Sequence, residues 1–299
     1  MSGMLSGMAR IAIIGGGSIG EALLSGLLRA GRQVKDLVVA ERMPDRAKYL
    51  SNTYGVLVVP SVKDAAENAT FVVVAVKPAD VEAVIDDLAG AAAAAEHDSA
   101  EQVFVTVAAG VTITYFESKL PAGTPVIRAM PNAAALVGAG VTALAKGRFV
   151  SSGQMDEVSE LFDAVGGVLT VSEQHLDAVT AVSGSGPAYF LLLVEALVDA
   201  GVAVGLSRQV ATELAAQTMA GSAAMLLERM DEGRRPADGE PIGLRVDTSP
   251  AQLRASVTSP GGTTAAGLRA LERGGFRVAV DAAVQAAKSR SEQLRITSE

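Results

Sequence analysis

The sequence predicts an α/β fold, with an N-terminal Rossmann-like, doubly wound sheet followed by an all-helical C-terminal domain. Short apolar runs alternate with helical patterns up to about Val171, whereas no strand-like run follows Glu173. Such alternation is typical of a parallel sheet covered by helices. A chain of 299 residues is long enough for roughly two domains. We therefore expect a sheet domain over residues 1–171 and a helical domain over residues 172–299.

Six apolar runs are the expected strands of the first domain. They consist mainly of Val, Ile and Ala, and continuous runs of this kind are typical of strands buried on both faces. Helical spacing in the intervals between them gives a βαβαβ order. The expected strands are residues 11–14, 37–40, 71–76, 103–107, 126–129 and 141–145, and the expected helices are residues 20–30, 44–54, 79–89 and 112–120.

Long segments rich in Ala and Leu make up the C-terminal part, over residues 176–230 and 264–294. Residues 231–249 between them are polar and contain several helix breakers, which predicts an exposed loop. The most apolar stretch, residues 188–206, is interrupted by acidic residues and glycines, so it falls short of a membrane span. We expect this stretch to be buried between the subunits of a homodimer or a higher homo-oligomer.

The composition narrows the classes of function. Hydrophobic residues make up 49% of the chain and charged residues 19%, as in a packed globular protein. The net charge of −8, with no run of Lys or Arg, argues against binding to nucleic acid or to an anionic membrane. Without cysteine and with only two histidines, disulfides, a Cys nucleophile and a zinc site are not expected. The first eight residues do not resemble a signal peptide, so a cytoplasmic protein is expected.

A glycine-rich turn follows the first expected strand and opens a helix. Gly15 permits the tight turn, Gly17 lets the backbone approach a pyrophosphate, and Gly20 lets the helix pack close to the sheet. The N–H groups at the helix N-terminus favour the negative charge of a dinucleotide. The expected contacts with the dinucleotide are Gly15, Gly17, Ser18, Ile19 and Gly20.

The end of the second strand carries two opposite signals for the choice of coenzyme. The carboxylate of Glu41 suits the ribose diol of NADH, whereas the guanidinium of Arg42 suits the 2′-phosphate of NADPH. Arg46 lies one helical turn after Arg42, and the two could hold a phosphate together or be merely solvated. We expect NADPH to be the coenzyme, with NADH accepted.

A second glycine loop, Ser259-Pro260-Gly261-Gly262-Thr263-Thr264, opens another helix. The two glycines expose backbone N–H groups, and the threonines place hydroxyls at a helix N-terminus, where a carboxylate binds well. The alternative is that Thr263 or Thr264 only caps the helix. Two separate anion sites suggest a dinucleotide in one and a small acid in the other.

Several motifs resemble those of pyrroline-5-carboxylate reductases, in the same order from Arg10 to about Leu294. The resemblance implies an NAD(P)H-dependent imine reductase that forms L-proline, with a Rossmann domain and a helical dimerisation domain. The motifs are Ala75-Val76-Lys77-Pro78, Ala108-Ala109-Gly110, Arg128-Ala129-Met130-Pro131-Asn132, Ser183-Gly184-Ser185-Gly186-Pro187-Ala188-Tyr189 and Val257-Thr258-Ser259-Pro260-Gly261-Gly262-Thr263-Thr264.

The resemblance also implies roles for single residues. Thr264 would pass a proton to the imine nitrogen, with solvent as the alternative donor. The implied nucleotide contacts are Val76, Lys77 and Ala108, with Asn132 beside the nicotinamide. The implied substrate contacts are Glu173, Asp247, Ser259, Gly261, Gly262, Thr263 and Thr264.

Alternatives to these roles remain open. Lys77 suits a solvated loop, Pro131-Asn132 a simple turn, and Glu173 the first turn of a helix. The Ser183–Pro187 glycines would also serve close helix packing, and His175 suits a helix start.

Two other functions are consistent with this plan. A β-hydroxyacid dehydrogenase or another imine reductase could share it, but such dehydrogenases depend on a lysine in the helical domain, and residues 181–229 contain none. A non-catalytic nucleotide sensor would leave the second glycine loop without a purpose.

Overall fold

The computed structural model describes residues 9–94, 102–234 and 250–296. The chain divides into two compact units, one formed by Met1–Pro187 together with Val284–Glu299 and the other by Ala188–Ala283. The first unit contains the sheet, and the described residues of the second form helices joined by turns. The chain therefore leaves the first unit, builds the second and returns to the first.

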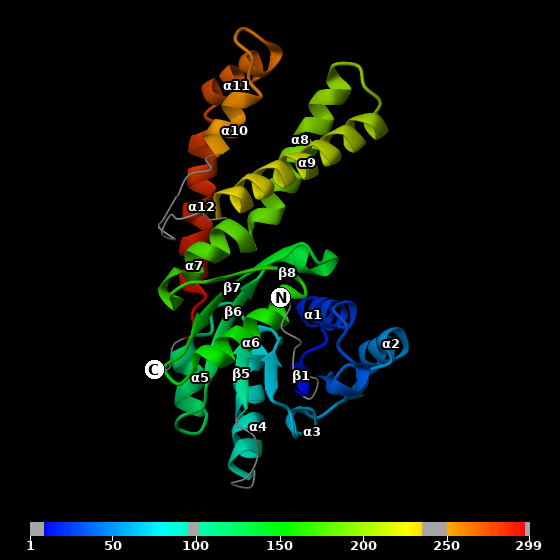
Figure 1. The fold of residues 1–299 in the computed structure, drawn as a ribbon, viewed down its shortest axis with the longest axis vertical. Helices are drawn as coiled ribbons and strands as arrows, with labels where there is room; N and C mark the ends of the chain where they lie inside the picture. Colours follow the sequence, from blue (N-terminus) through cyan, green and yellow to red (C-terminus); the bar gives the residue numbers. More distant parts are fainter. Residues whose placement is uncertain (1–8, 95–101, 235–249, 297–299) are drawn as a thin grey trace. The chain divides into compact units, whose positions relative to one another are not determined.

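Eight strands form one sheet in the order β3-β2-β1-β4-β5-β6-β7-β8 (Figure 1). Strand β1 lies between β2 and β4, so the chain reverses its direction of strand addition there, as in a doubly wound sheet. All neighbouring strands are parallel except β6 and β7. The strands are β1 (Ile11–Ile14), β2 (Leu37–Ala40), β3 (Leu57–Val59), β4 (Phe71–Val74), β5 (Val103–Thr106), β6 (Val126–Pro131), β7 (Gly140–Lys146) and β8 (Gly166–Thr170).

Helices cover both faces of the sheet. Ile11 and Ile13 of β1 pack into a core with α1 (Ser18–Arg29), α2 (Pro44–Tyr54) and α6 (Ser152–Asp163). Their neighbours Ala12 and Ile14 belong to a second core, with α3 (Val62–Ala66), α4 (Val81–Ala94) and α5 (Ile113–Lys119). Successive side chains of a strand point to opposite faces of the sheet, and both faces are buried here. This explains why the strands are continuous apolar runs.

Two strands and the direction of one pairing differ from the expectation. Strand β3 has three residues and is half-exposed at the sheet edge, and β8 begins with two glycines and is largely exposed, so neither contains a long apolar run. The expected parallel sheet contains one antiparallel pair, β6 and β7. The connection between them holds only the short helix η3 (Ala133–Val137), which is too short for a parallel crossover.

The helical part consists of α8, α9, α10, α11 and α12, and breaks interrupt the two long segments expected there. Gly205 and Gly275 have φ values of +108° and +76° between helices, a conformation that favours glycine. The bounds are α7 (Leu176–Val179), α8 (Gly186–Ala203), α9 (Arg208–Arg234), α10 (Pro250–Ser256), α11 (Thr263–Arg273) and α12 (Phe276–Gln293), with short turns η1 (Val34–Asp36), η2 (Pro78–Asp80), η4 (Glu173–His175) and η5 (Thr180–Gly184).

The second unit has little core of its own. Its fully buried apolar cluster contains only Val198, Ala211 and Ala215 among the described residues. On α8, Phe190 and Leu192 are 59% and 66% exposed. Exposed large apolar side chains gathered on one helix, as on α8, are typical of association surfaces.

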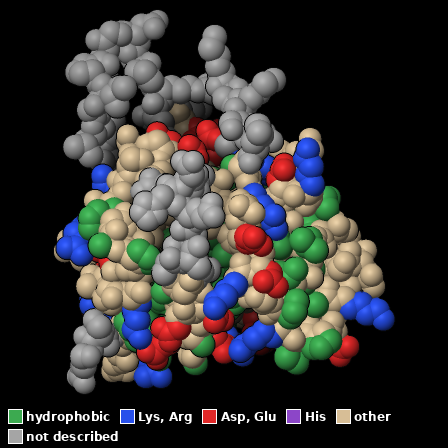
Figure 2. Space-filling view, turned by 90° about the horizontal axis from the view of Figure 1, so that it is seen from below, with side chains coloured by type: hydrophobic (Ala, Val, Ile, Leu, Met, Phe, Trp, Pro, Cys, Tyr) green, Lys and Arg blue, Asp and Glu red, His purple; other side chains and the backbone are tan. Residues whose placement is uncertain are grey.

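Charged side chains of both signs are interspersed over the described part of the face in Figure 2.

By length and composition alone, the helical segment Glu173–Ala203 is apolar enough to cross a membrane. One such helix is weak evidence for a membrane protein.

Candidate functional site

The glycine-rich turn between β1 and α1 has no room for side chains at two positions. Gly15 has a φ of +107°, and a Cβ atom there would lie 2.8 Å from the Ala75 carbonyl oxygen. A Cβ atom on Gly20 would lie 2.0 Å from the Gly15 carbonyl oxygen. Strand, turn and helix therefore pack so closely that only glycine fits at both positions.

The open side of the turn lies at Gly17 and Ser18. Gly17 is the N-cap of α1, no side chain caps this helix, and a Cβ atom on Gly17 would meet nothing within 4 Å. Ser18 is exposed and Ile19 half-buried at the first positions of the helix. The N–H groups of a first helical turn have no intrahelical partner, so this end can bind the pyrophosphate of a dinucleotide.

Three of the other expected nucleotide contacts follow two adjacent strands, β4 and β5. Val76 follows β4, and its Cγ1 would lie 3.0 Å from a Cβ atom on Gly15, so the two loops are in contact. Lys77 is exposed at the start of η2. Ala108 follows β5, is buried, and donates its N–H to Thr106 Oγ1 over 3.3 Å.

Asn132 joins the ends of β6 and β7. Its side-chain oxygen accepts a hydrogen bond of 3.2 Å from the Val141 N–H, and Pro131 before it is paired with Thr142. The Asn132 side chain therefore does more than form a local turn. Its amide nitrogen has no hydrogen-bond partner among residues 9–94, 102–234 and 250–296, so it can donate to a ligand.

The acidic and basic residues after β2 have separate partners. Glu41 accepts hydrogen bonds from Gly16 N–H (3.1 Å) and Met43 N–H (2.8 Å). Arg42 pairs with Asp80 at 2.9 Å, but their side chains are 73% and 38% exposed, and such surface pairs contribute little to stability. Arg42 thus remains accessible to an anion.

Arg46 has other partners than Arg42. Its Nε donates to the Gly16 carbonyl oxygen over 2.6 Å, and Nη2 pairs with Glu21. The Arg46 guanidinium is thus bonded to the glycine turn and to Glu21, and a joint phosphate contact of the two arginines stays a prediction.

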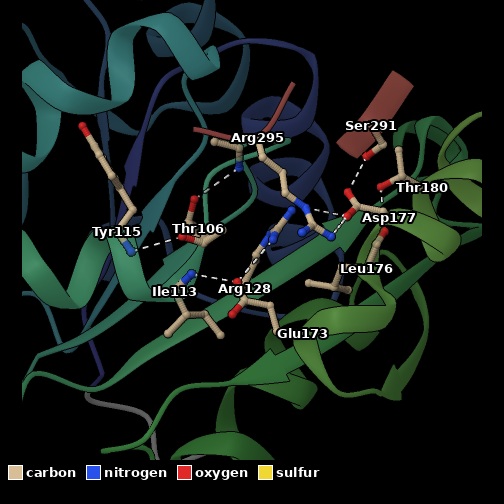
Figure 3. A network of polar contacts seen from close by, with 12 residues as sticks. Thr106, Ile113, Tyr115, Arg128, Glu173, Leu176, Asp177, Thr180, Ser291 and Arg295 are labelled. Carbon is tan, nitrogen blue, oxygen red and sulfur yellow. Dashed lines mark hydrogen bonds and ion pairs between the residues drawn. The ribbon is translucent and has the colours of Figure 1, made fainter. Parts of the chain in front are cut away.

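Glu173, expected to contact substrate, lies in a partly buried polar network (Figure 3). Its Oε1 accepts from the Ile113 N–H at 2.7 Å and from Arg128 Nη1 at 3.2 Å. Ile113 opens α5, and Arg128 in β6 is 4% exposed. Glu173 therefore compensates a buried guanidinium and caps a helix other than its own, while its contact with substrate stays a prediction.

Asp177 at the other end of this network was missed by the sequence analysis. It is buried and accepts from Ser291 Oγ (2.7 Å) and from Nε (2.8 Å) and Nη2 of Arg295. Burial by itself raises the pKa of Asp177, but hydrogen bonds from Ser291 and Arg295 and the charges of Arg295 and Arg128 bring the pKa below its usual value. Its hydrogen-bonding partners are more than a hundred residues away, so no local pattern signals the site.

The residues that follow α12 pack on the loop that carries Ala108. Ile296 N–H donates to the Gly110 carbonyl oxygen over 2.9 Å. Gly110 has a φ of +78°, and a Cβ atom there would lie 2.4 Å from the Leu294 carbonyl oxygen. The glycine of Ala108-Ala109-Gly110 is therefore required by this close approach.

The second glycine loop opens α11, within the second unit. Gly262 is the N-cap, no side chain caps the helix, and Thr263 and Thr264 are exposed at its first two positions. Gly261 has a φ of +72°, and Gly262 N–H closes the turn by donating to the Ser259 carbonyl oxygen over 3.0 Å. The threonine hydroxyls do not serve as caps, so the capping-only alternative is wrong, and this N-terminus can accept a carboxylate.

Other expected residues have simpler surroundings. Asp247 lies outside the described residues. A Cβ atom on Gly184 would lie 3.1 Å from Met130 Cε, which fits the close-packing alternative for this motif. His175 bonds to Ser172 Oγ through Nδ1 in η4. Within the described ranges no group of three or more His, Cys, Asp or Glu side chains could hold a metal.

Two family models match the chain. Residues 173–294 match pyrroline-5-carboxylate reductase dimerisation, and residues 10–110 match NADP oxidoreductase coenzyme F420-dependent. A pyrroline-5-carboxylate reductase from Mycobacterium tuberculosis is 83% identical over 296 residues, which cover 99% of this chain and 100% of that one. One from Corynebacterium melassecola is 42% identical over 96% of this chain and 99% of its own.

Solved structures agree with these matches. A pyrroline-5-carboxylate reductase from Coxiella burnetii has a TM-score of 0.84 and 32% identity, covering 97% of this chain and 100% of that one. A pyrroline carboxylate reductase from Plasmodium falciparum, solved with NADP bound, has a TM-score of 0.77 and 28% identity, covering 96% of this chain and 98% of its own.

Proposed function

The chain belongs to the pyrroline-5-carboxylate reductase family, and we propose that it reduces L-1-pyrroline-5-carboxylate to L-proline with NAD(P)H, the last step of proline biosynthesis. The observation that carries this is the 83% identity to the Mycobacterium tuberculosis reductase over practically the whole of both chains. The reaction makes the protein an oxidoreductase that acts on a carbon–nitrogen bond.

The glycine turn fits a dinucleotide. Gly17 is open, α1 has no side-chain cap, and Arg42 is accessible for a 2′-phosphate. We expect NADPH, as in the Plasmodium relative that holds NADP, with NADH accepted. The proposed coenzyme contacts are Gly15, Gly17, Ser18, Ile19, Gly20, Arg42, Val76, Lys77, Ala108 and Asn132.

The α11 N-terminus is the proposed site for the substrate carboxylate. Its free N–H groups and the Thr263 and Thr264 hydroxyls can orient the ring acid, and the Thr264 hydroxyl can pass a proton to the imine nitrogen. The coenzyme, when bound, supplies the hydride for the C=N carbon. The other proposed substrate contacts are Glu173, Asp247, Ser259, Gly261 and Gly262.

The two sites suggest a separate function for each of the two domains expected from the sequence. Residues 1–171 would bind the coenzyme, and residues 172–299 would bind the substrate and form the homo-oligomer. The family's dimerisation model over residues 173–294 supports the second assignment. We place the reaction in the cytoplasm.

The test is oxidation of NADPH and NADH by the purified protein with DL-pyrroline-5-carboxylate, with proline identified as the product. Proline formation in either reaction supports the proposal, and the two coenzymes at matched concentration rank Arg42 against Glu41 as the selector. Coenzyme binding without turnover would contradict it and favour a sensing role or a different imine.

A further inference from the structure

The middle residue of the glycine turn is held by side chains on both of its polar groups. Gly16 N–H donates to Glu41 Oε2 over 3.1 Å, and the Gly16 carbonyl oxygen accepts from Arg46 Nε over 2.6 Å. Leu50 packs against Gly16, since a Cβ atom on Gly16 would lie 2.4 Å from Leu50 Cδ1. The orientation of this residue is therefore fixed from outside the turn.

The bond to Arg46 sets the direction of the next N–H group. In a planar trans peptide the C=O and N–H groups point to opposite sides. Because the Gly16 carbonyl oxygen is directed at Arg46, the Gly17 N–H is directed away from Arg46. Gly17 is exposed, and no atom lies within 4 Å of where its Cβ would be.

Arg46 is itself fixed by a small cluster. Its Nη2 pairs with Glu21, which also accepts from the Tyr54 hydroxyl over 2.8 Å, and its guanidinium lies 5.0 Å from the Tyr49 ring centroid. Burial raises the pKa of Tyr54 to about 12, together with the bond to Glu21 and its charge. The Arg46 side chain is 31% exposed, much less than the 73% of Arg42. It therefore has defined partners, unlike a solvated arginine.

We propose that Arg46 is a positioning residue for coenzyme binding, which holds the Gly16 carbonyl so that the Gly17 N–H points at the coenzyme pyrophosphate. The inference rests on the proposed function only in that the turn binds a dinucleotide. Since NADH and NADPH share the pyrophosphate, Arg46 should affect both equally. A contact with the 2′-phosphate would affect NADPH alone.

The experiment compares Arg46→Ala and Arg46→Lys with Arg42→Ala, and uses Lys48→Ala on the same helix as the matched control, since Lys48 is exposed. KM and kcat are measured with each coenzyme, and the dissociation constant of ADP-ribose is measured without turnover. Melting temperatures are recorded for each variant. ADP-ribose contains the pyrophosphate but no 2′-phosphate and no nicotinamide.

For Arg46→Ala we expect KM for both coenzymes and the ADP-ribose dissociation constant to rise by the same factor, about tenfold, with kcat little changed. Arg46→Lys keeps the positive charge beside Glu21 but cannot donate to Glu21 and to the Gly16 carbonyl oxygen with the fixed geometry of a guanidinium. It should therefore restore the melting temperature more than the affinity for coenzyme and ADP-ribose. Arg42→Ala should weaken NADPH alone.

A loss confined to NADPH in the Arg46 variants would overturn the proposal, as would a lower melting temperature with unchanged affinity for ADP-ribose. If Arg46→Ala does not fold, Arg46→Lys provides the test. Its KM for each coenzyme and its dissociation constant for ADP-ribose are then compared with those of the unmodified protein. Failure of the unmodified protein to bind ADP-ribose or either coenzyme would instead contradict the proposed function.

Discussion

Gly17 and Gly20 lie in one turn, but Gly20 is tightly packed and Gly17 is open. Substitutions at the two positions should therefore affect stability and coenzyme binding separately. An alanine at position 20 meets the Gly15 carbonyl oxygen at 2.0 Å, whereas one at position 17 meets nothing within 4 Å. Gly20→Ala should lower the free energy of unfolding by about 1–3 kcal/mol or more. Gly17→Ala should lower it by less than about 1 kcal/mol, yet raise coenzyme KM. Urea titration and steady-state kinetics on both variants check this, and equal stability losses would contradict it.

Thr264 can be tested as the proton donor. Removal of a general acid slows the chemical step by roughly 10²–10⁴-fold, so Thr264→Ala should lower kcat while coenzyme binding is unchanged. Thr264→Ser keeps the hydroxyl and should recover most of the rate. If Thr264→Ala leaves both kcat and substrate KM unchanged, the assignment is wrong.

Single residues could be predicted from the sequence where a local backbone conformation requires them. Gly15 and Gly20 follow from a turn pattern, and the structure gives each a steric reason. Arg46 and Asp177 could not be assigned in the same way. Their hydrogen-bond partners include Gly16 and Ser291, which lie 30 and 114 residues away in sequence.

Between elements, Asp177 joins the short helix α7 to the end of α12, and its removal should destabilise the first unit. Asp177→Asn should lower the free energy of unfolding at pH 7 by about 1–3 kcal/mol, because Arg295 and Ser291 lose a charged acceptor. Urea titration measures this. Asp199→Asn, which breaks a pair with side chains 60% and 66% exposed, is the control and should change stability by less than about 1 kcal/mol.

The same carboxylate predicts a pH dependence. Since the pKa of folded Asp177 lies below its ordinary value of 3.8, its stabilisation is present above that pH and is lost as the pH falls through the depressed value. The stability difference between the unmodified protein and Asp177→Asn should therefore shrink below about pH 3.8. A difference that stays constant down to pH 3 would argue against this.

The elements that could be predicted are those whose burial appears in the local pattern. Strands β1, β2 and β5 are buried throughout and contain continuous apolar runs. Strands β3 and β8 are not, since they lie at the edges of the sheet, where β3 is half-exposed and β8 largely exposed. Their existence depends on neighbouring strands rather than on their own sequence.

For the whole molecule, the exposed apolar side chains of α8 predict where the subunits meet. Leu192→Glu places a charge on a surface that association would bury, so it should shift the protein to monomers. Leu192→Met, which conserves volume, should leave the oligomer intact. Light scattering at micromolar concentration distinguishes the two, and an unchanged mass for Leu192→Glu would place the interface elsewhere.

The helical character of the C-terminal part followed from composition, but its extent as a compact unit did not. The unit Ala188–Ala283 begins after and ends before the helical segment read from the sequence. The reason is that the end of α12 packs on the sheet unit through Ser291 and Arg295. Such packing between distant segments leaves no periodic signal.

The return of the chain to its first unit has a consequence for synthesis. Asp177 leaves the ribosome 114 residues before Ser291, a delay on the order of ten seconds at usual rates of translation. During that time the nascent sheet unit lacks the partners of a carboxylate that will end up buried. The unit can therefore reach its final state only after Ser291 and Arg295 have been synthesised, so a translational stall before these residues should leave its N-terminal part open to proteases although most of its residues have already been made.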